Sequence, residues 1–337
     1  MLDVVAIGSA TQDVFLKVNF PLVDKSEVPS GKAISLPFGE KLSADDIYFT
    51  IGGNAANASI TFARQGQKAA CISKLGQDDP ADVFMKRLNK EGVKTKFIIQ
   101  TPERPTSFSV LLLQAGERTI INYRGASNTF ALEDLNLKKL KANWWYISLS
   151  GESSAMLKPL LKFAKENSIR IAFNPTGYHL NHYRQDIVDS LGDIDFLVVN
   201  NGEAAELLGM PFDMNKEKEV FQKLDDMVPG IIAVTRGDKG VTVSDGSFAY
   251  TAGIFTEQRI LDRTGAGDAF GSGFVSTLIR YGQDYKKPEV IKEAIRFASA
   301  NATSVVENLG ASEGILAKDS FNVDSRWEDL KINQEAL

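Results

Sequence analysis

The sequence contains few of the residues on which disulfides and thiolate or imidazole metal sites depend. It has one cysteine, Cys71, and two histidines, His179 and His182. A single cysteine excludes an intramolecular disulfide, argues against a cysteine-based metal cluster and is consistent with a reducing compartment. Two histidines argue against a multi-histidine site. Their spacing of three, beside Asn, Pro and Gly residues, fits a loop or a helix start as well as a pair of ligands.

Long hydrophobic runs and basic clusters are also absent. No stretch approaches the length of a membrane span, and the first residues lack the basic region and the long apolar run of a signal peptide. The net charge is −5 with no sustained basic run, which argues against nucleic acid or an anionic membrane as a partner. These absences predict a cytoplasmic protein.

Two common phosphate-binding motifs are missing. No G-x-x-x-x-G-K-[ST] run occurs, which argues against a P-loop. The glycines around residue 265 lie late in the chain and do not follow the dinucleotide fingerprint, which argues against a dinucleotide-dependent oxidoreductase.

The composition that remains is ordinary for a globular protein, with 43% hydrophobic and 24% charged residues among 337. It suffices for a large core, in one large α/β domain or two smaller ones. The apolar patterns predict strands over residues 144–149, 169–173, 195–199 and 231–235, and helices over 156–166, 220–228 and 290–306. This alternation predicts a parallel sheet with helices on both faces.

Two other regions have strand patterns without intervening helices. Apolar residues alternate over 14–18 and 47–51, and residues 107–113 and 119–123 flank a turn at 114–117. These patterns predict a small second sheet, folded over the site as a lid. We assign residues 1–13, 54–105 and 124–317 to a main domain, 14–53 and 106–123 to the lid, and the polar residues 318–337, which show no clear period, to a C-terminal tail.

The stretch Asp262–Asp268, DRTGAGD, places glycines and an acid at the start of a helical pattern. Unpaired N–H groups at Gly265, Ala266 and Gly267 would favour a phosphate at this helix N-terminus. Asp268 could then accept a proton from a hydroxyl that attacks the phosphate. Taken alone, the stretch is equally compatible with a glycine-rich turn and a capping acid.

Polar residues follow the ends of several predicted strands. They are Asp13, Asn174, Asn200 and Glu203, and Thr235 with Gly237 and Gly240. Parallel strands place their carboxyl ends at one edge of a sheet, so we expect these residues to converge on one crevice. Phosphoryl transfer fits them, because it needs positioning, a metal on the phosphates and a base. Glu203 could hold Mg²⁺ through water, and Thr235 and Gly237 suit a nucleotide phosphate.

A bend at Gly52–Asn57 precedes a helix of small residues. Gly53 permits a close approach of the backbone. Asn54 is a good N-cap, whereas capping does not explain Asn57, one turn later. The two amides could bind sugar hydroxyls, because an amide offers both donors and an acceptor.

In these motifs the sequence resembles the PfkB (ribokinase-like) carbohydrate kinase family. The segments that carry the resemblance are Gly52–Asn57 with Phe62–Gly66 for the first signature, Asp262–Asp268 for the second, Asn200–Glu203 for the N-x-x-E motif and Thr235–Gly240 for the T-x-G-x-x-G turn. The match covers roughly Val4 to Ala317.

The resemblance implies a central, mostly parallel sheet flanked by helices, with a β lid that often mediates dimers. It also implies transfer of the ATP γ-phosphate to a sugar, sugar derivative or nucleoside, with Mg²⁺ and, in many members, K⁺. By motif position, the catalytic set is Asp268 with Gly265, Ala266 and Gly267; the substrate set is Asp13, Gly53, Asn54 and Asn57; the nucleotide set is Asn200, Thr235, Gly237, Gly240 and Asn301; the metal residues are Glu203 for Mg²⁺, and Asp262 and Thr264 for a monovalent cation. A polar helix face is an alternative account of Asn301.

Three features depart from the family pattern. The segment 14–50 is longer than in compact members. Arg263, at a position that is often a small or a hydroxyl residue, could reach a phosphate or point to solvent. Ala205 replaces a second acid of some members, so that metal binding would depend on Glu203, with Glu206 turned away.

We therefore predict an ATP-dependent kinase that acts on a sugar or sugar derivative. The first alternative is a nucleoside kinase of the same family. The second is a binding or regulatory protein that has lost catalysis, against which the intact Asp268 argues.

Overall fold

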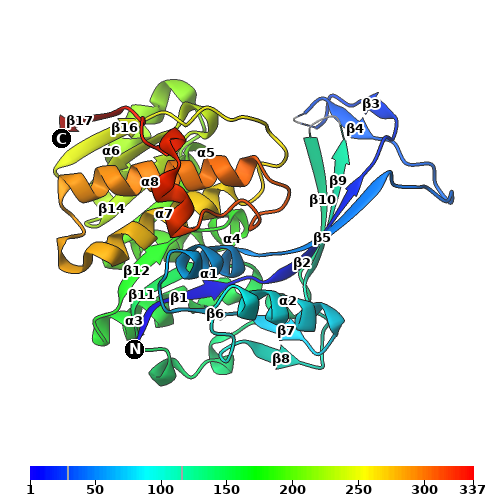
Figure 1. The fold of residues 1–337 in the computed structure, drawn as a ribbon, viewed down its shortest axis with the longest axis horizontal. Helices are drawn as coiled ribbons and strands as arrows, with labels where there is room; N and C mark the ends of the chain where they lie inside the picture. Colours follow the sequence, from blue (N-terminus) through cyan, green and yellow to red (C-terminus); the bar gives the residue numbers. More distant parts are fainter. Residues whose placement is uncertain (29, 115–116) are drawn as a thin grey trace.

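The computed structural model describes residues 1–28, 30–114 and 117–337. Within these ranges, nine strands form one large sheet (Figure 1). Across the sheet they are β17 (Ile332–Ala336), β16 (Phe248–Ala252), β15 (Val241–Ser244), β14 (Ile231–Thr235), β13 (Phe196–Asn200), β12 (Arg170–Phe173), β11 (Ala142–Ser148), β1 (Leu2–Gly8) and β6 (Ala69–Ile72). The strands from β14 to β6 are parallel, and β15, β16 and β17 add an antiparallel edge. The predicted mostly parallel sheet is confirmed.

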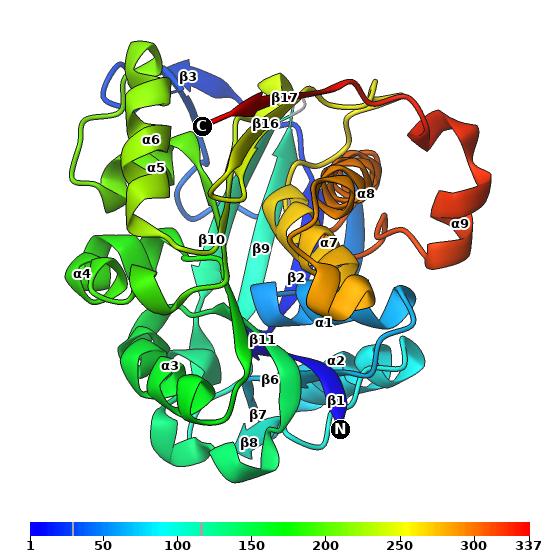
Figure 2. The same ribbon diagram turned by 90° about the vertical axis from the view of Figure 1, so that its left-hand side faces the viewer.

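Helices cover both faces of this sheet, as Figure 2 shows. One face carries α1 (Asn54–Arg64), α2 (Asp79–Lys90), α7 (Ala266–Tyr281) and α8 (Pro288–Val306), and the other carries α3 (Leu157–Glu166), α4 (Gly177–Val188), α5 (Asn201–Leu207) and α6 (Glu217–Met227). The pleat of β1 supplies both cores, because Val4 and Ala6 pack in one and Val5 and Ile7 in the other. The residues of β1 are apolar at successive positions because both faces of the sheet are buried under helices.

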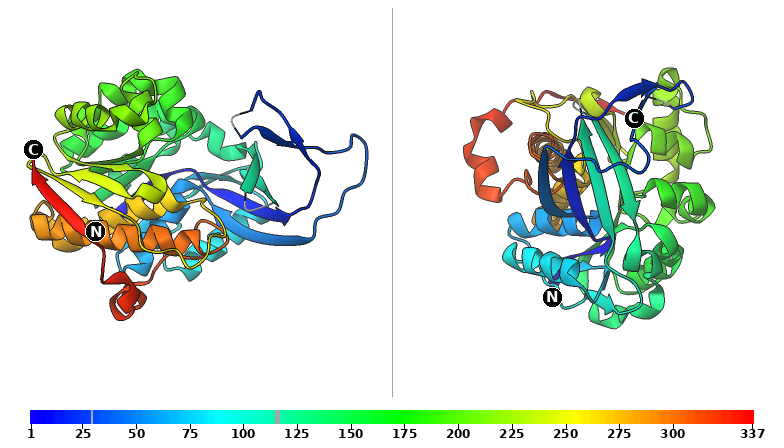
Figure 3. Two further views of the ribbon diagram at one scale, coloured as in Figure 1. Left: turned by 90° about the horizontal axis from the view of Figure 1, so that it is seen from above. Right: turned by 90° about the vertical axis from the view of Figure 1, so that its right-hand side faces the viewer.

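A smaller sheet projects from the main domain (Figures 1 and 3). Its strands, in order, are β10 (Glu117–Tyr123), β9 (Phe108–Gln114), β2 (Thr11–Lys17) and β5 (Asp46–Gly52). The predicted hairpin is confirmed by the antiparallel pairing of β9 and β10; residues 115–116 of its predicted turn lie outside the described residues. Asp13, expected just after the first strand, lies within β2.

The long segment between β2 and β5 forms a short hairpin of its own. Its strands β3 (Leu22–Asp24) and β4 (Lys32–Ile34) pair at the far end of the smaller sheet (Figure 1). Two further short strands, β7 (Lys74–Gly76) and β8 (Ile99–Thr101), pair beside the main sheet.

Residues 318–337 are not an irregular tail, which corrects the sequence prediction. They contain α9 (Lys318–Val323), and β17, which completes the edge of the large sheet. Phe321 and Trp327 are buried against Phe255 and Phe297. The apolar residues of this segment are too widely spaced to show a period, yet they bury a small satellite core.

The two histidines lie on α4, a helix that the sequence did not predict as such. His179 is fully buried and its ring lies edge-on to Phe173, whereas His182 is exposed and stacks on Tyr178. Burial lowers the pKa of His179 to about 4, so this imidazole is neutral at pH 7. The two side chains therefore do not form a ligand pair.

No helix in the described ranges combines the length and the apolar character that crossing a bilayer requires.

Candidate active site

The glycine-rich stretch opens α7. Gly265 precedes the helix with φ 80°, a left-handed conformation that favours glycine. A Cβ on Gly265 would lie 2.4 Å from Cβ of Ala311, so that a side chain is also excluded by space. The N–H groups of Gly267 and Asp268 belong to the first turn and have no acceptor further back in the helix. Together with the helix dipole, they favour an anion.

Asp268 is partly accessible from a cavity and is enclosed by protein atoms on its other sides. This enclosure raises the pKa of its carboxyl group to about 6, while a hydrogen bond from Asn57 lowers it. The Asn57 Nδ2 group donates to Oδ2 of Asp268 at 2.9 Å, and Asn174 Nδ2 lies 3.4 Å from Oδ1. Two amides thus orient the carboxylate without adding charge.

The position of Asn57 differs from the one expected for a sugar contact. Asn57 is 3% exposed and its amide nitrogen is used by Asp268. Its Oδ1 is buried and has no hydrogen-bond partner in the described part of the chain. The structure therefore places Asn57 behind the carboxylate of Asp268.

Asn54 is not the N-cap of α1, contrary to the sequence interpretation. Gly53 occupies that position with φ 95°, and Asn54 is the first helical residue. The Asn54 Nδ2 group instead donates to Oγ of Ser148 at 2.6 Å. A Cβ on Gly53 would lie 2.5 Å from the carbonyl oxygen of Ser9, which explains the glycine.

Asp13 is the buried acid at the base of the smaller sheet. It is 5% exposed, and burial raises its pKa to about 6, although hydrogen bonds with Ser109 and Thr11 lower it. A Cβ on Gly52 would approach Oδ2 of Asp13 to 2.0 Å. Oδ1 is buried and lacks a hydrogen-bond partner among the residues described, and Asp13 is not among the lining residues of the three cavities described next.

Three adjoining cavities run along the carboxyl edge of the parallel strands. The acceptor-side cavity, about 210 Å³, is lined by Gly8, Ser9, Ala10, Thr11, Asn54, Ser107, Asn122, Arg124, Ser127, Asn128, Ser150, Ser153 and Thr176. The central cavity is lined by Asn54, Asn174, Pro175, Thr176, Val198, Val199, Asn200, Glu203, Thr235, Gly265, Gly267 and Asp268. The helix-side cavity is lined by Asn200, Thr235, Gly237, Gly240, Val241, Ile254, Glu257, Arg263, Ala266, Gly267, Phe270, Ser299, Ala302, Thr303 and Val306.

Shared residues make these cavities continuous. Asn54 and Thr176 line both the acceptor-side and the central cavity. Asn200, Thr235 and Gly267 line both the central and the helix-side cavity. Asp268 and the anion-binding helix start therefore lie between a hydroxyl-rich cavity and a more apolar one.

Asn200 and Glu203 form a reciprocal cap at the start of α5. The Asn200 N–H donates to Oε2 of Glu203 at 2.8 Å, and the Glu203 N–H donates to Oδ1 of Asn200 at 2.9 Å. Burial raises the pKa of Glu203, as does the nearby charge of Asp268. Two carboxylates on one cavity make a cation favourable there. Ala205 is buried in the core and Glu206 is not among the lining residues.

The predicted nucleotide residues divide into two groups. Thr235, Gly237 and Gly240 line the helix-side cavity. Asn301 does not, which corrects its prediction: it is fully buried, donates from Nδ2 to the carbonyl of Ala269 and accepts from the N–H of Leu316. Asn301 ties α8 to α7, while its neighbours on α8 line the cavity.

Asp262 and Thr264 lie in the turn that leads to Gly265. Oδ1 of Asp262 accepts from the N–H of Thr264 at 2.9 Å and from its hydroxyl at 2.7 Å. Arg263 lines the helix-side cavity and lies 3.5 Å from Glu257. The Arg263 side chain is also 46% exposed, so it lies on the cavity and in contact with solvent at once.

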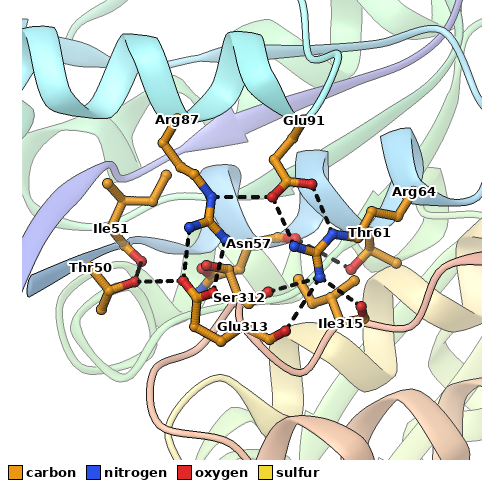
Figure 4. Close-up of polar contacts among 10 residues, drawn as sticks. All are labelled: Thr50, Ile51, Asn57, Thr61, Arg64, Arg87, Glu91, Ser312, Glu313 and Ile315. Carbon is orange, nitrogen blue, oxygen red and sulfur yellow. Dashed lines mark hydrogen bonds and ion pairs between the residues drawn. The ribbon is translucent and has the colours of Figure 1, made fainter. Parts of the chain in front are cut away.

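A polar network supports the turn that precedes α7 and was not predicted from the sequence (Figure 4). Glu91 accepts from both Arg64 and Arg87, and Arg87 also binds Glu313. Arg64 donates to the carbonyl groups of Ser312 and Ile315, at 3.2 and 2.7 Å. This network holds the segment that contains Ala311 against Gly265.

Only part of this network has a local signal. Arg87 and Glu91 are four residues apart at the C-terminal end of α2, a spacing at which side chains on a helix meet. Glu313 is 226 positions from Arg87 and also accepts from the hydroxyl of Thr50, so no local pattern indicates it.

Comparison with known proteins gives one consistent family. The model of the pfkB family carbohydrate kinases matches residues 1–318. A fructokinase from Vibrio alginolyticus is 30% identical over 277 residues, covering 77% of this chain and 86% of that protein. A ribokinase from Haemophilus influenzae is 27% identical over 84% of this chain and 90% of that protein.

Solved structures agree on the fold. The structure of a ribokinase from Giardia lamblia matches with a TM-score of 0.79 at 22% identity, covering 95% of this chain and 97% of that one. The resemblance inferred from the four motifs is thereby confirmed, together with the ribokinase-like fold. The chain belongs to the pfkB family of carbohydrate kinases.

Proposed function

We propose that this protein transfers the γ-phosphate of ATP to a hydroxyl of a sugar or sugar derivative, with Asp268 as the general base. The observation that carries the proposal is the position of Asp268, between a hydroxyl-rich cavity and an apolar one and at an anion-binding helix start. The hydroxyl-rich cavity, Asp268 and the apolar cavity follow one another in the order in which a sugar, a general base and a nucleotide would have to lie for phosphoryl transfer.

Asp268 is suited to accept a proton at neutral pH. With a pKa of about 6, it is largely ionised at pH 7 and is a stronger base than an ordinary carboxylate. The acceptor hydroxyl gives its proton to Asp268, its oxygen forms the new bond to phosphorus, and the bond between the γ-phosphorus and the bridging oxygen breaks to release ADP. The N–H groups of Gly267 and Asp268 stabilise the transferred charge.

The acceptor-side cavity offers the groups that a polyol needs. Serine and threonine hydroxyls and the amides of Asn54 and Asn122 can each donate and accept hydrogen bonds. The unpartnered Oδ1 of Asp13 is a further acceptor at the base of the smaller sheet. We assign Asp13, Gly53 and Asn54 to the substrate, and Asn57 to the orientation of Asp268.

The helix-side cavity suits a nucleotide. Apolar side chains of Val241, Ile254 and Phe270 can face a base. Gly237 and Gly240 line the same helix-side cavity, and Thr235 also lines the central cavity, where phosphates would reach Asp268. Glu203 would hold Mg²⁺ through water. When bound, Mg²⁺ neutralises phosphate charge. In the described ranges, no group of three or more His, Cys, Asp or Glu side chains forms a dedicated metal site.

The smaller sheet is proposed to act as a lid and to pair with the lid of a second copy. Its strands place Phe49, Val14, Val110 and Ile121 in one cross-strand row. Phe49 is 64% exposed and Ile121 is 59% exposed, so both ends of this row, on the two edge strands, are apolar surface. A second copy presenting the same face would bury it, as isologous interfaces do.

The decisive experiment is ADP release from Mg-ATP with a panel of ketoses, aldoses, sugar phosphates, sugar acids and nucleosides. We expect turnover with at least one sugar, and loss of that turnover in Asp268→Asn with ATP binding retained. Asp319→Asn is the matched control, because Asp319 is exposed on α9. Turnover with nucleosides alone would replace the sugar by a nucleoside. Full turnover in Asp268→Asn would refute its role as base.

A further inference from the structure

An arginine of the smaller sheet reaches the turn before the anion-binding helix. Nε of Arg118, on β10, lies 3.6 Å from Oδ1 of Asp262. The Asp262 side chain is fully buried, and that of Arg118 is 31% exposed. The pair thus joins the two parts of the molecule that enclose the cavities.

Asp262 has one cationic partner in the described part of the chain. Its neighbour Arg263 instead lies against Glu257. Oδ1 of Asp262 accepts from Thr264, but Oδ2 is buried and has no hydrogen-bond partner among the described residues. A buried carboxylate that loses its only counter-charge is strongly destabilised. The turn at residues 262–264 is therefore stable when Arg118 is in place.

The residues present do not fit the monovalent cation that the family resemblance implies at Asp262 and Thr264. The Thr264 hydroxyl donates a hydrogen bond to Oδ1 of Asp262, so this hydroxyl group is already used. A guanidinium already stands beside the same carboxylate oxygen. A K⁺ ion bound there would face a fixed positive charge of the protein.

We propose that Arg118 takes the place of this cation and is a positioning residue for the phosphoryl transfer proposed above. Its guanidinium neutralises Asp262 and so fixes the turn that leads directly into Gly265. Arg118 pairs with Leu113 near the outer end of the β9–β10 hairpin (Figure 1), so the contact exists only while the sheet lies over the site. Closure of the lid and alignment of the anion-binding N–H groups are thereby coupled.

The kinetic test compares Arg118→Met and Arg118→Lys in KCl and in choline chloride at equal ionic strength. The control is Lys17→Met: Lys17 is exposed in the same cross-strand row and forms no ion pair among the described residues. Without K⁺, we expect kcat of Arg118→Met to fall about tenfold, because Asp262 loses its counter-charge and the turn before Gly265 loses its fixed position. Arg118→Lys and Lys17→Met should stay within about twofold of wild type.

Addition of K⁺ distinguishes positioning from a merely structural role. We expect KCl to restore kcat of Arg118→Met, because the ion can enter the vacated place beside Asp262, and to leave the wild type unchanged. A wild type that is activated by K⁺ but not by choline would overturn the proposal. So would an Arg118→Met variant with wild-type kcat in the absence of K⁺.

A second measurement needs no kinase activity and so separates this proposal from the proposed function. Thermal unfolding of Arg118→Met, Asp262→Asn and the double variant gives the coupling between the two side chains. We expect strong coupling and a K⁺-specific rise of the melting temperature in Arg118→Met alone. If the loss of stability in the double variant equals the sum of the losses in the two single variants, Arg118 does not neutralise Asp262, whatever reaction the protein catalyses.

Discussion

Replacing Asp268 by asparagine is expected to stabilise the protein while abolishing turnover. Burial raises the pKa of this carboxyl from its ordinary value of 3.8 to about 6. One pKa unit corresponds to about 1.4 kcal/mol, so ionisation of Asp268 destabilises the folded state by at most about 3 kcal/mol. The uncharged amide in Asp268→Asn would avoid this cost. Its oxygen could still accept the hydrogen bond from Asn57, and its nitrogen would replace only the longer 3.4 Å contact with Asn174.

The sign of the effect fixes its pH dependence. A carboxyl with a raised pKa in the folded state favours folding below its unfolded pKa, and this contribution is lost as pH rises through the folded value. The wild type should therefore lose stability relative to Asp268→Asn between about pH 4 and pH 6. We expect a difference of about 1 kcal/mol at pH 4.5 that reaches about 3 kcal/mol above pH 7.

Thermal unfolding over pH 4.5–8 measures this difference. An unfolding entropy of about 2.1 cal/mol/K per residue over the chain converts 3 kcal/mol to a rise of about 4 °C in the melting temperature at pH 7 or above. The burial of Asp13 affects both proteins and cancels in the comparison. Asp319→Asn should show no such trend. A pH-independent difference, or a less stable Asp268→Asn at pH 7, would refute the raised pKa and with it the case for Asp268 as an unusually strong base.

Three other changes test contacts away from Asp268. Glu313→Gln removes the ion pair with Arg87, and we expect kcat to fall at unchanged KM for ATP. The loss of stability should be about 1 kcal/mol, because the pair is partly exposed. An unchanged kcat would show that the segment around Glu313 does not position the start of α7. Removal of residues 318–337 exposes Phe255 and Phe297, which Trp327 and Phe321 cover, and denaturant unfolding should show a loss of at least about 3 kcal/mol; equal stability would contradict the integration of β17 and α9. Phe49→Asp places a charge on the proposed lid–lid surface, so light scattering should show a lower mass than for the wild type if the wild type is a dimer, and an unchanged dimer would exclude this face.

Much of the main domain was predictable from local patterns. Runs such as Ile231–Thr235 are apolar at nearly every position because helices cover both sides of the strand, and such runs are visible without knowledge of partners. The antiparallel edge was not predictable in the same way. β17, with sequence INQEA, is a polar edge strand whose position depends on pairing with β16.

The site shows the same division. The helix start at Gly265–Asp268 was expected from the sequence, and the structure places it at the junction of the cavities. Asn54 and Asn57 were expected to play one role together. Their roles differ because successive turns of α1 have different surroundings. Asn54 lies on the cavity, whereas Asn57 lies behind Asp268. Asn301 could not be distinguished from a cavity residue until its two buried hydrogen bonds were seen.

The sequence alone determined the family, the alternation of strands and helices in much of the main domain and the positions of the glycine-rich turns, because each of these depends on residues close together in the chain. The tertiary structure decided which side chains act on one another. Asn57 and Asp268 are 211 positions apart, and Arg118 reaches Asp262 from a different sheet. Such pairs depend on how elements pack over long chain separations, and no local period or propensity encodes that packing.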